Sequence, residues 1–179
     1  YFKVKKIIKE NNVHVFSSNY SLYGDISERV MEILLRFSPE VEIYSIDEAF
    51  LSFKGFKISE LRAYCLHIRN IIKQWVGIPV SIGVSSTKTL SKAANHLAKK
   101  NPELEGICIL KDSKKIDESL KRIEIGDVWG IGRRFSKFLN SQGIKTAKQF
   151  VDLDRRWVRK NMGVVGEKTQ MELKGISCL

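Results

Sequence analysis

The sequence of 179 residues has few cysteines, few prolines and no long apolar run. Its three cysteines lie too far apart for a CxxC motif or a zinc knuckle, and an odd number gives no closed disulfide framework (Cys65, Cys108 and Cys178). No apolar run reaches ~18 residues, so no membrane-spanning helix is predicted. We therefore expect reduced thiols, a cytoplasmic location and no membrane partner. The chain begins with Tyr1 and not with Met, so we also expect a longer parent protein.

Acidic residues are scarce relative to basic ones, and the imbalance is local. The net charge is +11, and residues 88–179 hold 20 of the 31 Lys and Arg but only 11 of the 20 Asp and Glu. A half that carries +9 predicts a surface for a polyanion, of which nucleic acid is the commonest. The alternative is a basic surface that only keeps the protein soluble.

Hydrophobic periodicity predicts an α+β protein, with strands and helices mixed up to residue 112 and only short helices beyond it. Strands are expected at Val13–Ser17, Val41–Phe53 (a hairpin), Pro79–Val84 and Gly106–Leu110, and helices at Ser21–Phe37, Ile58–Val76, Thr87–Lys100 and Arg133–Ser141. Because a charged stretch follows Asp112, we place a domain boundary there. The predicted parts are 1–12, 13–112 and 113–179.

Two adjacent acids interrupt the hydrophobic hairpin segment. Asp47 and Glu48 lie where the hairpin should bend, and ionised carboxylates are costly to bury unless they are paired or bound to metal. Carboxylate oxygens at one bend can bind a divalent cation, and two Mg²⁺ ions can activate a primer hydroxyl and neutralise pyrophosphate. An ordinary acidic turn is the alternative.

The expected helix Thr87–Lys100 carries lysines beside its apolar face. Lys92 and Lys99 are seven residues apart, so they lie on one side of the helix. Paired ammonium groups suit the oxygens of a triphosphate. A solvated basic face would have the same pattern.

The segment Val128–Gly132 has the pattern of a helix-hairpin-helix turn. Gly130 and Gly132 let a phosphate approach the backbone, and Arg133 and Arg134 follow at once. Such a contact is independent of base sequence. A weaker copy is expected at Met162–Gly166, and a plain glycine turn is the alternative in both places.

Four segments together resemble the Y-family translesion DNA polymerases, and especially their UmuC-like branch. They are FSSNYSLYGDISERV (16–30), SPEVEIYSIDEAF (38–50), IPVSIGVSSTKTLSKAANHLAKK (78–100) and DVWGIGRRFSKFLNSQGIKT (127–146). The resemblance implies a ferredoxin-like palm, whose sheet is covered by helices, followed by a small all-α thumb with a helix-hairpin-helix. Residues 1–12 would then be a remnant of the fingers.

The resemblance also implies residue roles. In the family, the Asp and Glu of the SIDEA motif bind catalytic Mg²⁺, which corresponds to Asp47 and Glu48. Lys99 matches the lysine that contacts the incoming deoxynucleoside triphosphate, and Lys92 would assist it. The thumb would hold primer–template DNA through its hairpin glycines.

The sequence departs from the family pattern at both ends. The first metal-binding Asp, most of the fingers and the C-terminal little finger have no counterpart in it. We therefore expect a polymerase as the parent protein, an incomplete two-metal site and no activity in this fragment alone. A sliding clamp and accessory SOS-response proteins would be contacted through regions outside it.

Two other functions remain open on the residues alone. One is a non-catalytic DNA-repair module that binds DNA through its helix-hairpin-helix. The other is a nucleotide cyclase, which shares the palm topology but has no duplex to hold. Salt-dependent binding of duplex DNA would separate a cyclase from the other two.

Overall fold

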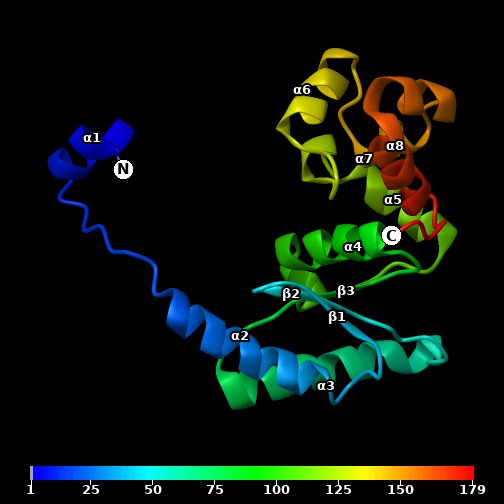
Figure 1. The fold of residues 1–179 in the computed structure, drawn as a ribbon. Coiled ribbons are helices and arrows are strands. Elements are labelled where there is room, and N and C mark those ends of the chain that lie inside the picture. Colours follow the sequence, from blue (N-terminus) through cyan, green and yellow to red (C-terminus); the bar gives the residue numbers. More distant parts are fainter. Residues whose placement is uncertain (1) are drawn as a thin grey trace. The chain divides into compact units, whose positions relative to one another are not determined.

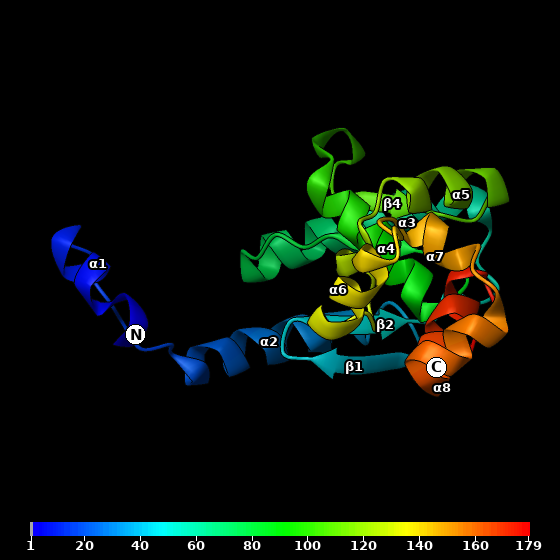
Figure 2. The same ribbon diagram turned by 90° about the horizontal axis from the view of Figure 1, so that it is seen from above.

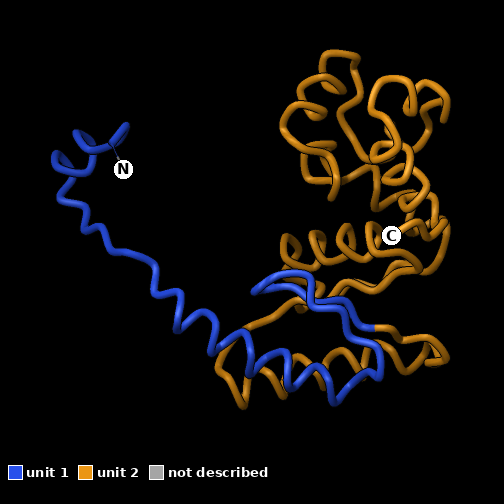
Figure 3. The backbone as a smooth tube through the Cα atoms, viewed as in Figure 1, with its two compact units in different colours: residues 1–51 blue, residues 52–179 orange. Residues whose placement is uncertain are grey.

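The computed structural model describes residues 2–179, which form two compact units. Unit 1 covers residues 1–51 and unit 2 covers residues 52–179 (Figure 3). The helices and strands of both are labelled in Figure 1. None of the described helices is both long enough and apolar enough to cross a membrane.

Unit 1 contains three helical elements and a hairpin. They are η1 (Phe2–Val4), α1 (Lys5–Glu10), α2 (Tyr20–Leu34), β1 (Val41–Ser45) and β2 (Glu48–Leu51). The side chain of Asn19 caps α2 by accepting the backbone N–H of Leu22. Figure 2 shows β1 and β2 side by side, as their antiparallel pairing requires.

The prediction of a strand at Val13–Ser17 is wrong, because these residues form neither a strand nor a helix. A strand is stabilised by a paired neighbour and by burial of one face. Val13 and Val15 are both more than half exposed, and none of the strands described in residues 2–179 pairs with their segment. The alternating apolar residues therefore had no sheet to join.

Unit 2 holds the remaining elements. In chain order they are α3 (Ile58–Val76), β3 (Ile82–Val84), α4 (Lys88–Lys100), η2 (Pro102–Leu104), β4 (Ile107–Ile109), α5 (Ser113–Lys121), η3 (Ile125–Asp127), α6 (Arg133–Ser141), α7 (Ala147–Val151) and α8 (Arg155–Leu173). Strands β3 and β4 pair in parallel, with Ile82 opposite Ile107. The chain from 113 onward contains helices and no strand, as predicted.

The β3–β4 pair is covered by α3 on one face and by α4 on the other. Val84 and Ile107 pack with Leu61 of α3 in one hydrophobic cluster. On the opposite face a Cβ on Gly83 would lie 2.2 Å from the backbone N of Asn95, so α4 rests directly on β3. Side chains alternate across a strand, which lets a three-residue strand contact both helices. Each element of this layer follows the predicted order.

A second, larger core runs from α4 through to α8. Its fully buried members include Leu90, Leu120, Leu139, Phe150 and Leu173. The helices after residue 112 therefore share a core with α4, so α4 is fixed relative to the helices that follow it. The predicted α+β class is confirmed, with the strands paired as two two-stranded sheets.

Candidate nucleic-acid interface and acidic hairpin

The β1–β2 turn, which we call the acidic hairpin, carries Asp47 and Glu48. Asp47 is exposed in the turn, and Glu48 is the half-buried first residue of β2, paired with Ser45. The hydroxyl of Ser45 donates to Oδ1 of Asp47 at 2.7 Å. An irregularity in the register between Ile43 and Ser45 shapes this end of the hairpin. The carboxylate of Asp47 is thus oriented by its neighbour and open to solvent.

The acidic hairpin offers two carboxylates and no more. Among residues 2–179, no group of three or more His, Cys, Asp and Glu side chains is arranged to hold a metal ion. Mg²⁺ usually takes one or two protein carboxylates and fills its remaining positions with water and phosphate oxygens. Two adjacent carboxylates fit part of such a shell.

Helix α4 carries the two lysines that were predicted to contact a triphosphate. The hydroxyl of Thr87 caps the N-terminus of α4 by accepting the backbone N–H of Leu90. The buried side of the helix includes Ala94. Lys92 is half-buried beside this packing face, whereas Lys99 is exposed. The acidic hairpin belongs to unit 1 and α4 to unit 2, so the convergence of the carboxylates and the lysines stays a prediction.

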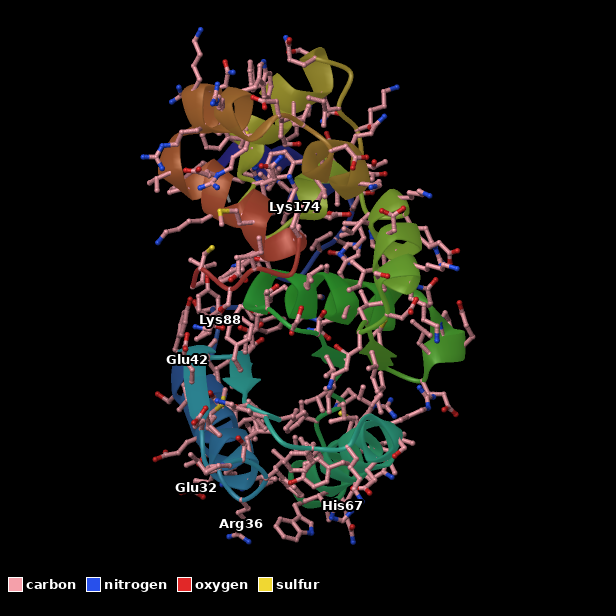
Figure 4. All side chains as sticks on the ribbon, turned by 90° about the vertical axis from the view of Figure 1, so that its right-hand side faces the viewer. Glu32, Arg36, Glu42, His67, Lys88 and Lys174 are labelled. Atoms are coloured by element: carbon pink, nitrogen blue, oxygen red, sulfur yellow. The ribbon has the colours of Figure 1, made fainter. Side chains whose placement is uncertain are left out.

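The start of α4 is joined to the end of α8 by a buried carboxylate. Glu172 is fully buried, and its Oε2 accepts the backbone N–H of Thr89 at 3.0 Å while Oε1 accepts that of Cys178 at 2.6 Å. The hydroxyl of Thr87 donates to the backbone carbonyl of Glu172 at 2.7 Å. Figure 4 labels Lys88 and Lys174, which mark the two helix ends that meet there. The sequence did not predict this role for Glu172, since a glutamate inside a helix carries no signal of burial.

The C-terminal part of α4 contacts Asp127, the residue that precedes the predicted DNA-binding turn. Lys100 Nζ lies 3.2 Å from Oδ2 of Asp127, and His96 Nε2 lies 3.4 Å from the same oxygen. Burial, and then the charge of Lys100, lower the pKa of His96. His96 is therefore mostly neutral at pH 7, and the ionic contact is the one from Lys100.

Residues 128–132, the glycine hairpin, form a tight turn on the surface of α8. Val128 and Ile131 are buried, and the N–H of Ile131 donates to the carbonyl of Val128 at 2.9 Å. Gly130 has φ +93°, and a Cβ there would lie 2.6 Å from Oγ1 of Thr169. Both facts require glycine at this position.

Gly132 differs from Gly130 in what its missing side chain would meet. Its φ of −75° suits any residue, and a Cβ would have no neighbour within 4 Å. It caps α6, whose first two residues are the exposed Arg133 and Arg134. In the described part of the chain neither arginine has an ion-pair partner. An external phosphate could approach the backbone at Gly132 and be met by both cations.

A second turn interrupts α8, where the weaker glycine copy was expected. Gly163 has φ +70° and ψ −164°, a combination that is nearly restricted to glycine, so α8 is two helices joined at a kink. Before the kink lie Arg155, Arg156, Arg159 and Lys160. This cluster was not among the predicted site residues, although its i, i+1, i+4, i+5 spacing places the four cations on adjoining helix faces.

The fold is shared with solved DNA polymerases. A structure described as the insertion ternary complex of Dbh DNA polymerase aligns with 98% of this chain and 52% of its own length, with a TM-score of 0.79 and 21% identity. DinB from Sulfolobus solfataricus aligns with 95% of this chain and 50% of its own, with a TM-score of 0.73 and 22% identity. The chain thus shares the fold of about half of each of these polymerases.

Sequence similarity then gives the family. The IMS family (impB/mucB/samB) matches residues 1–96. Protein UmuC of Salmonella typhimurium strain LT2 is 42% identical over 181 residues, and protein ImpB of Salmonella typhimurium is 38% identical over 182. A DNA polymerase IV of Picrophilus torridus is 36% identical over 148 residues, which cover 81% of this chain and 39% of that protein. The chain belongs to the impB/mucB/samB family.

The match covers the whole chain but only part of its relatives. UmuC and ImpB each align with 100% of this chain and with 43% of their own length. The resemblance to the UmuC-like branch is confirmed, and the chain spans under half the length of these relatives.

Proposed function

We propose that this chain is the palm-and-thumb portion of a DNA-directed DNA polymerase that performs translesion synthesis in the DNA-damage response. The observation that carries the proposal is the shared hydrophobic core of α4 and the glycine hairpin, which includes Leu97, Val128 and Ile131 and fixes the hairpin relative to the lysine helix α4. A grip on DNA and a surface for a triphosphate would then be held at a constant spacing. Membership of the impB/mucB/samB family supports the same reading.

The glycine hairpin would hold the backbone of primer–template DNA. Gly132 leaves room for a phosphate at the start of α6, and Arg133 and Arg134 supply charge without reading bases. A polymerase has to bind every sequence that it copies, so a contact limited to phosphates suits the task.

Lys92 and Lys99 would bind the triphosphate of the incoming deoxynucleotide. Lys92 is held beside the packed face of α4, whereas Lys99 extends into solvent. Ammonium groups of this kind neutralise phosphate oxygens as mobile point charges. Glu172 supports this role indirectly, because it fixes the first turn of the helix that carries both lysines.

Asp47 and Glu48 would hold Mg²⁺ at the acidic hairpin. The Ser45 hydroxyl keeps one oxygen of Asp47 oriented, and the exposed position of the turn leaves the carboxylate accessible. When bound, Mg²⁺ supplies positive charge to a primer hydroxyl and to the phosphates. Because the described residues add no third carboxylate to this pair, we expect the chain alone to be inactive.

Other partners follow from the same proposal. A sliding clamp and accessory SOS-response proteins would bind through the parts of the relatives that this chain does not cover. The free thiols of Cys65, Cys108 and Cys178 agree with a reducing, cytoplasmic location.

The DNA grip can be tested on the chain itself. We expect duplex DNA to bind with an affinity that falls linearly with the logarithm of salt concentration. Arg133→Ala/Arg134→Ala should reduce the magnitude of that slope by about 1–2, because each lost phosphate contact reduces it by roughly 0.9. Lys114→Ala/Lys115→Ala removes two exposed cations from α5 and serves as the matched control. A wild-type chain that does not bind duplex DNA would refute the proposal.

A non-catalytic DNA-repair module is the second candidate function. Only the basic half of the chain, residues 88–179, favours it. The two are separated in the full-length parent by Asp47→Ala. A polymerase should lose Mg²⁺-dependent primer extension, by a factor of 10² or more if a metal ligand is removed, while DNA binding persists. Unchanged primer extension would remove Asp47 from the catalytic site.

A further inference from the structure

We propose that the first half of α8 forms a second site for a phosphodiester group of the bound DNA, separate from the glycine hairpin. The inference rests on the proposed DNA-binding function and adds a contact to it. The site is an open pocket of about 410 Å³ lined by Arg155, Arg156, Arg159, Lys160 and Glu167, which we call the arginine pocket. Four cations and one anion leave it with a formal charge of +3.

The arginine pocket exists because α8 is kinked. In a straight helix Arg155 and Glu167 would lie about 18 Å apart along the axis, at 1.5 Å per residue. The turn at Gly163 brings them together instead, and Nε of Arg155 donates to Oε1 of Glu167 at 2.6 Å. The pocket is thus a product of the tertiary fold and not of the helix periodicity.

Glu167 holds two guanidinium groups in place without neutralising the site. Its Oε2 accepts from Arg159, and its side chain is only 12% exposed, compared with 61% for Arg155 and 55% for Arg159. Each guanidinium has five N–H donors, so both retain donors directed elsewhere. Their geometry is therefore set before any ligand arrives, which lowers the entropic cost of binding.

The other two cations of the pocket are Arg156 and Lys160. Within the part of the chain that the structure describes, neither Arg156 nor Lys160 forms an ion pair or a side-chain hydrogen bond. They are four residues apart and so lie on one face of the helix, both exposed. Like charges at this spacing repel one another. An anionic ligand would relieve that repulsion.

The pocket is fixed to the helix that follows the glycine hairpin. Trp157 of α8 stacks on Phe138 of α6, with ring centroids 5.8 Å apart and planes 14° from parallel. Val158 is fully buried, and Asp154 accepts the N–H of Trp157 at 2.9 Å. One DNA strand that touched both places would therefore meet two phosphate contacts at a constant spacing.

Arginine forks and exposed cations recognise phosphate oxygens without regard to base. Since residues 88–179 carry +9 and the proposed DNA grip belongs to the same core, a strand phosphate is the occupant that the observations favour. Inorganic phosphate offers the same oxygens and is distinguished by the test.

The test measures duplex binding by the complete chain over a range of salt concentrations. We expect Arg156→Ala/Lys160→Ala to lower the slope by about 1 and leave the melting temperature unchanged. Arg156→Lys/Lys160→Arg should retain the wild-type slope, because it keeps both charges. A slope change no larger than that of Lys114→Ala/Lys115→Ala would overturn the site, and the proposed function would still stand if Arg133→Ala/Arg134→Ala weakened binding.

A second arm identifies the source of the phosphate. At constant ionic strength, replacing chloride by inorganic phosphate should weaken DNA binding by the wild type more than by Arg156→Ala/Lys160→Ala, because the free anion competes with the strand phosphate for the pocket. If phosphate raised the melting temperature of the wild type only, and weakened DNA binding by both proteins equally, the pocket would be a site for the free anion, and the assignment to a DNA strand would be wrong.

Discussion

The backbone N–H of Thr89 donates to the carboxylate of Glu172 at 3.0 Å, across 83 residues of sequence. A fully buried glutamate on α8 thereby caps the helix that carries the proposed triphosphate lysines. The negative charge faces the positive end of the helix dipole, so the contact is favourable beyond the hydrogen bond itself. This single side chain couples the last helix of the chain to the lysine helix.

Removing that carboxylate should destabilise the protein strongly. Glu172→Ala would leave the N–H groups of Thr89 and Cys178 without their acceptor in a buried site. The expected loss is about 2–4 kcal/mol of unfolding free energy, measured by urea denaturation. Glu172→Gln retains one acceptor oxygen and should cost less than Glu172→Ala. Equal stability of the alanine variant and the wild type would show that the contact is dispensable.

The two glycines of the glycine hairpin should respond differently to alanine. Gly130→Ala combines a positive φ with a contact 2.6 Å from Thr169 Oγ1, so we expect a loss of about 2–4 kcal/mol. Gly132→Ala has allowed angles and free space, so its stability should change by no more than about 1 kcal/mol.

DNA affinity should reveal the role of Gly132, just as stability reveals the role of Gly130. Gly132→Ala places a methyl group where a phosphate would approach, so DNA affinity should fall in a protein that is still folded. Paired thermal melts and salt-titrated binding curves provide the comparison. If Gly132→Ala binds DNA as tightly as the wild type, the phosphate does not contact this glycine.

The arginine pocket should make stability depend on pH in the acid range. Hydrogen bonds from Arg155 and then Arg159 lower the pKa of Glu167 below its usual value of 4.5. A carboxyl whose pKa is lower in the folded state contributes stability above its unfolded pKa and loses it as pH falls through the folded pKa. Wild-type stability should therefore decline below about pH 4.5 more steeply than that of Glu167→Gln. Parallel pH profiles for the two proteins would contradict the assignment.

The three thiols should differ in reactivity in the native state. Burial raises the pKa of Cys65 to about 11 and also raises that of Cys108, so both stay protonated and covered at pH 8. Cys178 is partly exposed near the C-terminus. Iodoacetamide followed by mass spectrometry should label Cys178 first, and the other two only after unfolding. Early labelling of Cys65 would show that α3 opens readily.

Local patterns in the sequence were enough for the elements whose signals are local. The bounds predicted for Ile58–Val76 and Arg133–Ser141 match α3 and α6, because apolar periodicity and flanking glycines specify a helix from neighbouring residues alone. The motifs that resemble the UmuC-like branch likewise gave the family. The roles of Asp47, Glu48, Lys92 and Lys99 stay predictions.

What the tertiary structure decided depends on contacts between distant residues. Val13–Ser17 has the alternation of a strand but forms none, since a strand needs a partner that its own sequence does not supply. Glu172 is an ordinary helical glutamate until α8 packs on α4, and Glu167 meets Arg155 only because the chain turns at Gly163. Burial, capping across the chain and pocket formation are properties of the packed molecule, so no local pattern encodes them.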